Sequence, residues 1–152
     1  NENIDSEYFI DRIEKGIIRE NNKNYKTNVF GKMTPWRYFN KDPKFYDLVK
    51  NFIISIKAPL PDLGLEDAWG IKINKYDFTR EHAHGGSLLS GVLYFSDCEE
   101  SIEFPELRIK VLPKKGTFLL FSGWLKHRVD IQYSEVPKYA IAMNFKEQNQ
   151  FS

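Results

Sequence analysis

The feature that most constrains the fold is a series of short apolar segments, separated by turn residues, in the part of the chain after residue 64. The first of them, residues 69–76, alternates apolar and polar side chains, as a strand with one buried face does. Similar segments follow at close spacing, at residues 88–95, 101–104, 108–112, 117–121 and 139–145. Many short strands that follow helical segments indicate a mainly β fold, an antiparallel sandwich or barrel with a helical support.

Two segments before this series have the patterns of helices. From Ser6 to Ile18, a capping residue is followed by acidic residues and by apolar side chains at helical spacing, which predicts a short amphipathic helix. Asp42 and Pro43 begin a stronger pattern, because a capping residue precedes a proline at the first helical position and an apolar stripe follows. We expect this helix to end near Ala58 and to pack its stripe against a sheet. The polar residues 19–28 predict a loop.

The bulk properties of the chain exclude several classes of protein. We expect residues 1–152 to form a single domain, since this length suffices to bury one core. The 22 basic and 21 acidic residues nearly cancel, so the net charge predicts neither a nucleic-acid partner nor a membrane surface. Cys98 is the only cysteine and no apolar run approaches the roughly 20 residues of a membrane span. We therefore expect a cytoplasmic protein.

All three histidines of the chain stand where they can converge. His82 and His84 are two residues apart, so in an extended segment their imidazoles point to the same face. His127 follows the apolar run at residues 118–121, which is typical of a strand leading into a turn. A lone His-x-His pair is also common among hydrogen-bonded surface residues. A fold that lays the two segments side by side completes a three-histidine metal site with coordination positions left open for chemistry.

Four stretches of the sequence carry a resemblance to a known family, and they are residues 82–84, 90–95, 123–129 and 138–145. Together they are similar to the core of the iron(II)- and 2-oxoglutarate-dependent dioxygenases. Within that superfamily they most resemble small oxygenases with a Ser-Gly-Val-x-Tyr strand and, more distantly, prolyl hydroxylases. The resemblance implies a double-stranded β-helix, or jelly roll, over about residues 69–145, with N-terminal supporting helices over about residues 6–58.

The resemblance also implies a metal site, although this chain departs from the family pattern at one position. The family motif is His-x-Asp/Glu followed at a distance by a second histidine. Carried over, His82 and His127 take the two histidine positions, and His84 falls where the family has a carboxylate. Imidazole also suits iron(II), but a site of three histidines keeps the full +2 charge of the ion. Asp77 and Glu81 are nearby carboxylates that stay open as alternative ligands.

The same resemblance implies where the cosubstrate binds. In the family, a cation on the last strand binds the far carboxylate of 2-oxoglutarate, and Lys138 takes that place at the start of the last expected strand. Tyr94 is expected to offer its hydroxyl to the same carboxylate, and Asn74 or Tyr76 to contact the end near the metal. Taken alone, Lys138 is also typical of a solvated strand edge and Tyr94 of a core aromatic residue.

Three functions follow from these patterns. The first is a non-haem iron(II), 2-oxoglutarate-dependent dioxygenase, with ascorbate as reductant, that hydroxylates a substrate while 2-oxoglutarate is decarboxylated to succinate. The second is a cupin-type dioxygenase with three histidines, which needs neither 2-oxoglutarate nor Lys138. The third is a jelly-roll binding module without catalysis, which the missing carboxylate at position 84 favours. For the first we expect a small-molecule or peptide substrate, and neither nucleic acid nor membrane as partner.

Overall fold

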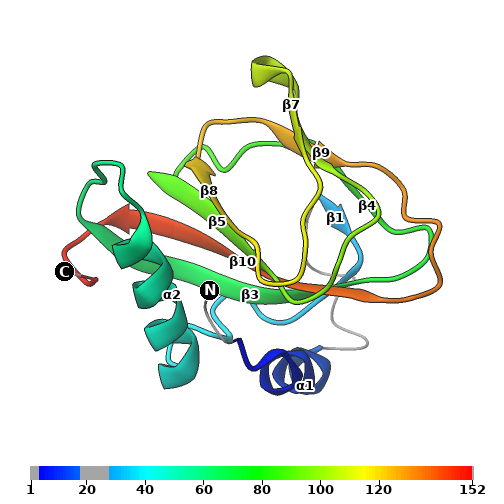
Figure 1. Cartoon of the computed structure of the whole chain (residues 1–152), viewed down its shortest axis with the longest axis horizontal. Coiled ribbons are helices and arrows are strands. Elements are labelled where there is room, and N and C mark those ends of the chain that lie inside the picture. Colours follow the sequence, from blue (N-terminus) through cyan, green and yellow to red (C-terminus); the bar gives the residue numbers. More distant parts are fainter. Residues whose placement is uncertain (1–3, 18–27, 152) are drawn as a thin grey trace.

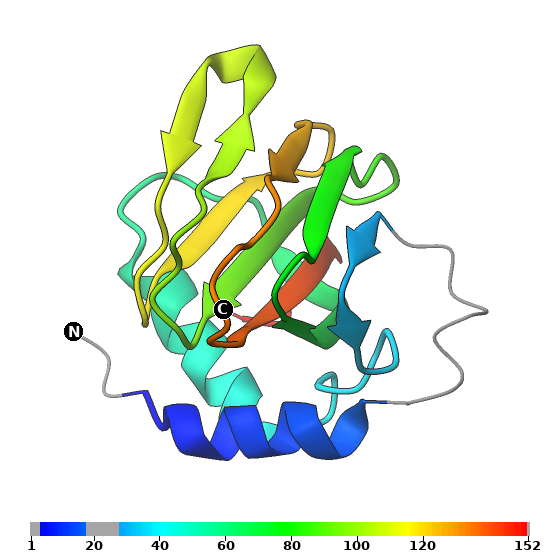
Figure 2. The same ribbon diagram turned by 90° about the vertical axis from the view of Figure 1, so that its right-hand side faces the viewer.

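Two antiparallel sheets of five strands each form the body of the computed structural model, which describes residues 4–17 and 28–151. Two α-helices, α1 (Ser6–Gly16) and α2 (Pro43–Ser55), cover the outer face of one sheet, as Figures 1 and 2 show. The double-stranded β-helix with N-terminal supporting helices that the sequence predicts is confirmed. Neither of these helices is long and apolar enough to cross a membrane.

The sheet under the helices, called here the helix-covered sheet, has the strand order β2-β3-β10-β5-β8. Its strands are β2 (Lys32–Met33), β3 (Leu63–Ile73), β10 (Lys138–Glu147), β5 (Leu89–Tyr94) and β8 (Phe118–Ser122). The opposite sheet has the order β1-β4-β9-β6-β7. Its strands are β1 (Val29–Phe30), β4 (Phe78–His82), β9 (His127–Val129), β6 (Ile102–Phe104) and β7 (Ile109–Val111), and a 3-10 turn, η2 (Pro105–Leu107), joins the last two.

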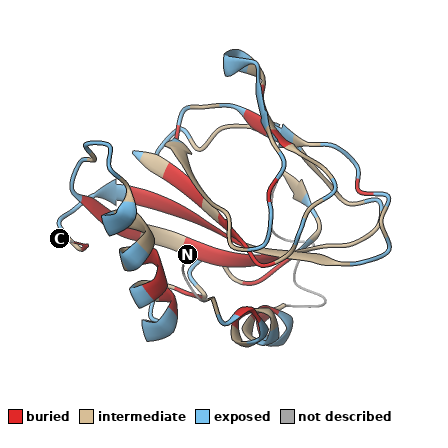
Figure 3. Cartoon of the chain, in the orientation of Figure 1, coloured by how far each residue is buried: buried red, intermediate tan, exposed pale blue. Residues whose placement is uncertain are grey.

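Strand β10 lies at the centre of the helix-covered sheet and separates the core from the interior of the jelly roll. Because successive side chains of a strand point to opposite faces, one set of its residues packs under the helices. These are Tyr139, Ile141, Met143 and Phe145, which belong to or pack against the main hydrophobic core. The alternate residues Lys138, Ala140 and Ala142 line an interior pocket between the sheets. Figure 3 shows the resulting band of buried residues along β3, β5 and β10.

The two helices are joined to each other through the carboxylate of Asp42. This residue caps α2, since its Oδ1 accepts a hydrogen bond of 3.0 Å from the backbone N–H of Phe45. Its Oδ2 accepts a hydrogen bond of 2.8 Å from the hydroxyl of Tyr8, and Arg12 Nε lies 3.3 Å from the same oxygen. Tyr8 and Arg12 both belong to α1, and the Asp42 side chain is only 2% exposed. One buried acid therefore fixes the packing of α1 against the start of α2.

Several element boundaries differ from the sequence expectation. Helix α1 is capped by Asp5 rather than Ser6. Helix α2 ends at Ser55, three residues before Ala58, because Ile56 is already extended and the Ser55 hydroxyl donates to the carbonyl of Phe52. The loop expected at residues 19–28 lies outside the described residues except for its last position.

The strands differ from expectation most where the alternation of side chains is interrupted. Strand β3 begins at Leu63 instead of residue 69, since a β-bulge in this strand breaks the alternation. It ends at Ile73, before Tyr76, whose backbone takes a left-handed conformation with φ of 73°. The other expected strands are present with ends shifted by one or two residues.

We predict that Asp42→Ala lowers the free energy of unfolding by about 2–4 kcal/mol, because it removes a helix cap, the acceptor of the Tyr8 hydroxyl and the ion-pair partner of Arg12. Urea unfolding monitored by circular dichroism measures the change. Asp11→Ala is the matched control, since the ion pair of Asp11 with Lys15 is exposed on both sides and its loss should cost less than about 0.5 kcal/mol. Equal losses in the two variants would contradict the role of Asp42.

Candidate metal centre and cosubstrate pocket

The pairing of β4 with β9 brings two of the histidines together. Their register sets His82 directly opposite His127, which closes the distance between residues that lie 45 positions apart in sequence. Residues directly opposite in an antiparallel pair have Cα atoms about 4.5–5.5 Å apart, so their side chains meet on one face. The ring centroids of His82 and His127 are 4.4 Å apart.

His84 reaches the same point from beyond the end of β4. Its segment is held by the turn before β9, because the backbone N–H of His84 donates to the carbonyl of Gly123 at 2.7 Å. The approach is so close that a Cβ atom on Gly123 would lie 2.1 Å from the carbonyl oxygen of Ser87. Glycine at position 123 is therefore what allows the His84 loop and the turn toward His127 to touch.

The three imidazoles are oriented by hydrogen bonds at their outer nitrogens. His82 Nδ1 lies 2.6 Å from the carbonyl of Arg80, and His127 Nδ1 lies 3.1 Å from the carbonyl of Leu125. His84 Nδ1 lies 2.7 Å from Oδ1 of Asn144. Since these partners are acceptors, each Nδ1 carries the proton and each Nε2 keeps a free lone pair.

The free lone pairs face one another across a small space. The Nε2 atoms of His82 and His84 are 3.1 Å apart, and one ligand atom from each of the three histidines lies within 4.8 Å of the others. Two unprotonated nitrogens at this distance repel, whereas ligands bound about 2.0–2.2 Å from a shared metal ion are roughly 3.0–3.5 Å apart. The donor set therefore fits a divalent transition metal.

Burial keeps these histidines neutral, as metal ligands must be. It lowers the pKa of His127 to about 4, with the neighbouring His82 adding to the effect. It also lowers the pKa of His82 and of His84, although the hydrogen bond of His84 with Asn144 acts in the opposite direction. The site is thus in its metal-binding protonation state at neutral pH.

The two alternative carboxylates do not join this cluster, which among the described residues consists of the three histidines alone. Glu81 is exposed, as its neighbour His82 occupies the inward position at the end of β4. Asp77 lines the pocket but accepts a hydrogen bond of 2.7 Å from the backbone N–H of Asn74, and burial raises its pKa.

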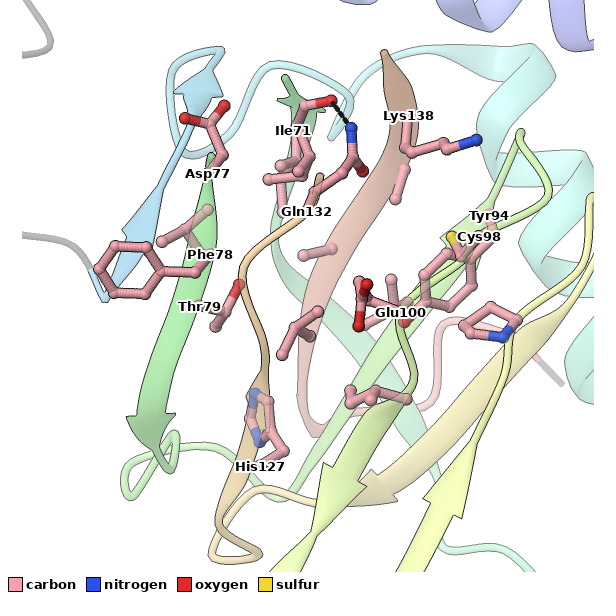
Figure 4. A pocket seen from close by; sticks show the side chains of 18 of the residues that line it. Ile71, Asp77, Phe78, Thr79, Tyr94, Cys98, Glu100, His127, Gln132 and Lys138 are labelled. Atoms are coloured by element: carbon pink, nitrogen blue, oxygen red, sulfur yellow. Dashed lines mark hydrogen bonds between the residues drawn. The ribbon is translucent and has the colours of Figure 1, made fainter. Parts of the chain in front are cut away.

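Lys138 and Tyr94 line the same pocket as the histidines. In Figure 4, His127 lies toward one end of the pocket, and Lys138, Tyr94 and Cys98 gather toward the other. Strand β10 carries Ala140 and Ala142 on the pocket face between these ends, and such small side chains leave space in the middle. Lys138 is 12% exposed and lies 3.6 Å from Glu99, whose side chain is 59% exposed.

Tyr94 and Cys98 are both uncharged where they meet the pocket. Burial raises the pKa of Tyr94, and no residue in the described part of the chain makes a hydrogen bond with its hydroxyl. Burial also raises the pKa of the Cys98 thiol to about 11, an effect that Lys138 partly opposes. Cys98 is therefore no thiolate nucleophile, as its acidic neighbours in the sequence suggest.

The structure does not bring Asn74 and Tyr76 into the pocket lining. Both belong to the turn after β3, where the left-handed backbone of Tyr76 directs its ring outward. That ring is 62% exposed and contacts Tyr133 edge to face at 6.2 Å. Their expected contact with the end of 2-oxoglutarate near the metal stays a prediction that this geometry does not favour.

Two residues of the site were not found by sequence reasoning. Asn144 contacts His84 and is 8% exposed. Trp69 stacks on His84 with ring centroids 6.2 Å apart, and its indole N–H is buried without an acceptor among the described residues. The sequence could have indicated only Asn144, because this residue lies an even number of positions after Lys138 in the last strand and therefore shares its face.

Comparison with known proteins shows which solved structures share this fold. A scan against models of protein families found no match, and a search of curated proteins found none. Among solved structures, the viral collagen prolyl hydroxylase of Paramecium Bursaria Chlorella virus-1 with 2-oxoglutarate is 17% identical, with a TM-score of 0.65. The match covers 95% of this chain and 91% of that chain.

Two further solved structures agree. The prolyl hydroxylase from Trichoplax adhaerens with a hypoxia inducible factor peptide has a TM-score of 0.67 at 14% identity, over 96% of this chain and 80% of that chain. HygX from Streptomyces hygroscopicus, with nickel and 2-oxoglutarate bound, has a TM-score of 0.62 at 11% identity, over 97% of this chain and 88% of that chain. The chain has the fold of the 2-oxoglutarate and iron(II) oxygenases, as the sequence motifs imply.

We predict that the metal-free protein loses stability as the pH falls, because His127 stays neutral in the folded state. The unfolded chain takes up a proton near pH 6.5, whereas the folded chain does so only near pH 4. Unfolding is therefore increasingly favoured as the pH falls between these values, by up to about 3 kcal/mol from this residue. Urea unfolding in EDTA at pH 7 and pH 4.5 measures the loss. His127→Gln should reduce it, and an unchanged loss would contradict the assignment.

We predict that Gly123→Ala weakens metal binding, because the added methyl group pushes the His84 loop away from the turn before His127. The expected loss is about tenfold or more, the order seen when the supports of metal ligands are removed. Competition with a chromogenic chelator measures the affinity for cobalt(II). Gly86→Ala is the control, since a Cβ atom there meets nothing within 4 Å. Equal affinities in the two variants would refute the claim that Gly123 sets the ligand geometry.

Proposed function

We propose that this protein is a non-haem iron(II), 2-oxoglutarate-dependent dioxygenase that hydroxylates a small-molecule or peptide substrate. The observation that carries the proposal is the set of three neutral histidines whose Nε2 lone pairs converge at one end of a pocket that also holds Lys138. Within the described residues, Lys138 is the one lysine or arginine that lines this pocket. The shared fold of the oxygenases named above supports the same reading.

The chain's own residues would divide the work as follows. His82, His84 and His127 hold the iron through Nε2. Lys138 binds the far carboxylate of 2-oxoglutarate as a point charge, and the hydroxyl of Tyr94 donates to it. When bound, iron and 2-oxoglutarate supply the oxidising power for hydroxylation, with ascorbate as reductant, and 2-oxoglutarate ends as succinate. The apolar walls of the pocket exclude water from the reacting groups.

The contact between Lys138 and Glu99 is compatible with this role. Glu99 is 59% exposed, and a solvent-exposed partner at 3.6 Å adds little stability to an ion pair. A dicarboxylate in the pocket offers Lys138 a better partner, since the lysine side chain itself is almost buried. We therefore expect cosubstrate binding to replace Glu99 at the lysine.

A second function is favoured by one observation, the absence of a carboxylate from the cluster of ligands found among the described residues. A dioxygenase of the cupin type with three neutral ligands would use dioxygen without 2-oxoglutarate. Such an enzyme has no need of Lys138 in the pocket, so the two functions separate at this residue.

The first experiment measures succinate formation from 2-oxoglutarate by the purified protein with iron(II), ascorbate and oxygen. We expect this protein to convert 2-oxoglutarate to succinate slowly even without its substrate. This succinate formation should vanish in His127→Ala. No succinate, together with no protection of the fold by 2-oxoglutarate in a thermal melt, would move the assignment to the cupin-type enzyme or to a binding module without catalysis.

We predict that Lys138→Ala raises the KM for 2-oxoglutarate by roughly 10- to 100-fold, because a charge-assisted contact worth about 1.5–3 kcal/mol is lost. The affinity for iron(II) should stay unchanged, since Lys138 lies away from the histidines. Lys75→Ala is the matched control, a lysine that is also paired with an acid, Glu135, but lies outside the pocket lining. An unchanged KM in Lys138→Ala would refute the assignment of this residue and favour the cupin-type function.

A further inference from the structure

Asn144 connects the candidate metal ligand His84 to two further polar residues, Ser90 and Asp67. Its Oδ1 accepts a hydrogen bond of 2.9 Å from the hydroxyl of Ser90 and lies 2.7 Å from Nδ1 of His84. Its Nδ2 lies 3.5 Å from Oδ2 of Asp67. An amide oxygen with two donors and an amide nitrogen facing a carboxylate agree on a single orientation of the side chain. The chain of contacts therefore runs from Asp67 through Asn144 to His84.

A β-bulge in β3 gives Asp67 its place in this chain. The pairing of β10 with β3 passes from Asn144 opposite Asp67 to Phe145 opposite Leu65, so Glu66 is an extra residue on β3. In an unbroken strand, Asp67 would share a face with Leu65, which packs in the core under the helices. The extra residue reverses this relation and turns the carboxylate toward the side of the metal ligands.

The residues after the bulge confirm the change of face. Trp69, Ile71 and Ile73 have the same parity as Asp67, and all three line the pocket. Ala68, of the opposite parity, lies in the core under the helices with Leu63 and Leu65. The β-bulge in β3 therefore places one acidic residue, Asp67, beside Asn144.

The chemical consequence concerns charge. Three imidazoles are neutral ligands, so a divalent ion among His82, His84 and His127 keeps its full charge. A carboxylate one residue further out offsets part of that charge and strengthens the donor character of the imidazole that it reaches, as partners of ligating histidines do in other metal sites. We propose that Asn144 and Asp67 are positioning residues for His84, Asn144 fixing the Nδ1–H tautomer and Asp67 supplying, through Asn144, the negative charge that the ligands lack.

This inference rests on the metal site of the proposed function, and two readouts keep the two separable. The first is the tautomer of His84 in the metal-free protein, measured by long-range proton–nitrogen NMR with nitrogen-15 histidine. The second is the affinity for cobalt(II), measured by chelator competition. If the wild-type protein bound no cobalt, the metal site and the role of Asp67 would both be overturned. The NMR spectrum would still decide whether Asn144 orients His84.

Three variants test the network. Asn144→Leu keeps the volume but removes the acceptor, so His84 should lose its single Nδ1–H tautomer and cobalt affinity should fall by roughly 10- to 100-fold. Asn144→Asp keeps an acceptor and adds charge, so the tautomer should stay and binding should be at least as tight as in the wild type. Asp67→Asn should keep the tautomer and weaken binding by about tenfold.

The matched control is Asp130→Asn, which removes an acid that lines the same pocket but makes no hydrogen bond to a histidine in the described structure. It should change neither readout. A wild-type tautomer and wild-type affinity in Asn144→Leu would overturn the role of Asn144. An affinity in Asp67→Asn equal to that of Asp130→Asn would overturn the role of Asp67. A purely structural role for Asn144 would lower thermal stability in both of its variants without the rescue by aspartate.

Discussion

The pairing of β10 with β3 on one side and β5 on the other is the constraint on which the rest of the structure depends. It gives one strand two environments, with Ile141, Met143 and Phe145 packed under the helices and Lys138, Ala140 and Ala142 lining the pocket. A slip of one residue would exchange the two sets. The same hydrogen-bonded register that buries the core therefore also sets where a cation and a hydrogen-bond acceptor stand in the site.

In the histidine cluster, backbone carbonyls orient two of the three candidate metal ligands. Two of the three outer nitrogens face carbonyls of residues two positions earlier in the chain, Arg80 and Leu125. These local contacts fix ring orientation without any contribution from distant parts of the fold. His84 differs, because its partner is the side chain of Asn144 on another strand. His84, which stands where the resembled family has a carboxylate, is thus the histidine with the long-range support.

The sequence predicted the strands that are long and alternate apolar with polar side chains. It also predicted that the histidines converge, because the chain has only three of them. It did not predict the positions of β4 and β9, since strands of five and three residues carry little periodicity. It extended β3 to Tyr76 although the strand ends at Ile73, because a left-handed backbone at a residue other than glycine leaves no sequence signal. It missed Asp67 because the face of that residue depends on a bulge, and a bulge interrupts the pattern by which faces are predicted.

The bulge at Glu66 also bears on which changes of chain length this protein can tolerate. Deleting Glu66 would make β3 continuous and leave the other residues on their present faces, because Leu65 and Asp67 would become direct neighbours on opposite faces of the strand. Substitutions at this position keep the count of residues and leave both faces as they are. A deletion far from the bulge would instead exchange the two faces on one side of the gap. Across the evolution of such a chain, we therefore expect a loss of one residue from this strand to be accepted at the bulge and rejected further along β3.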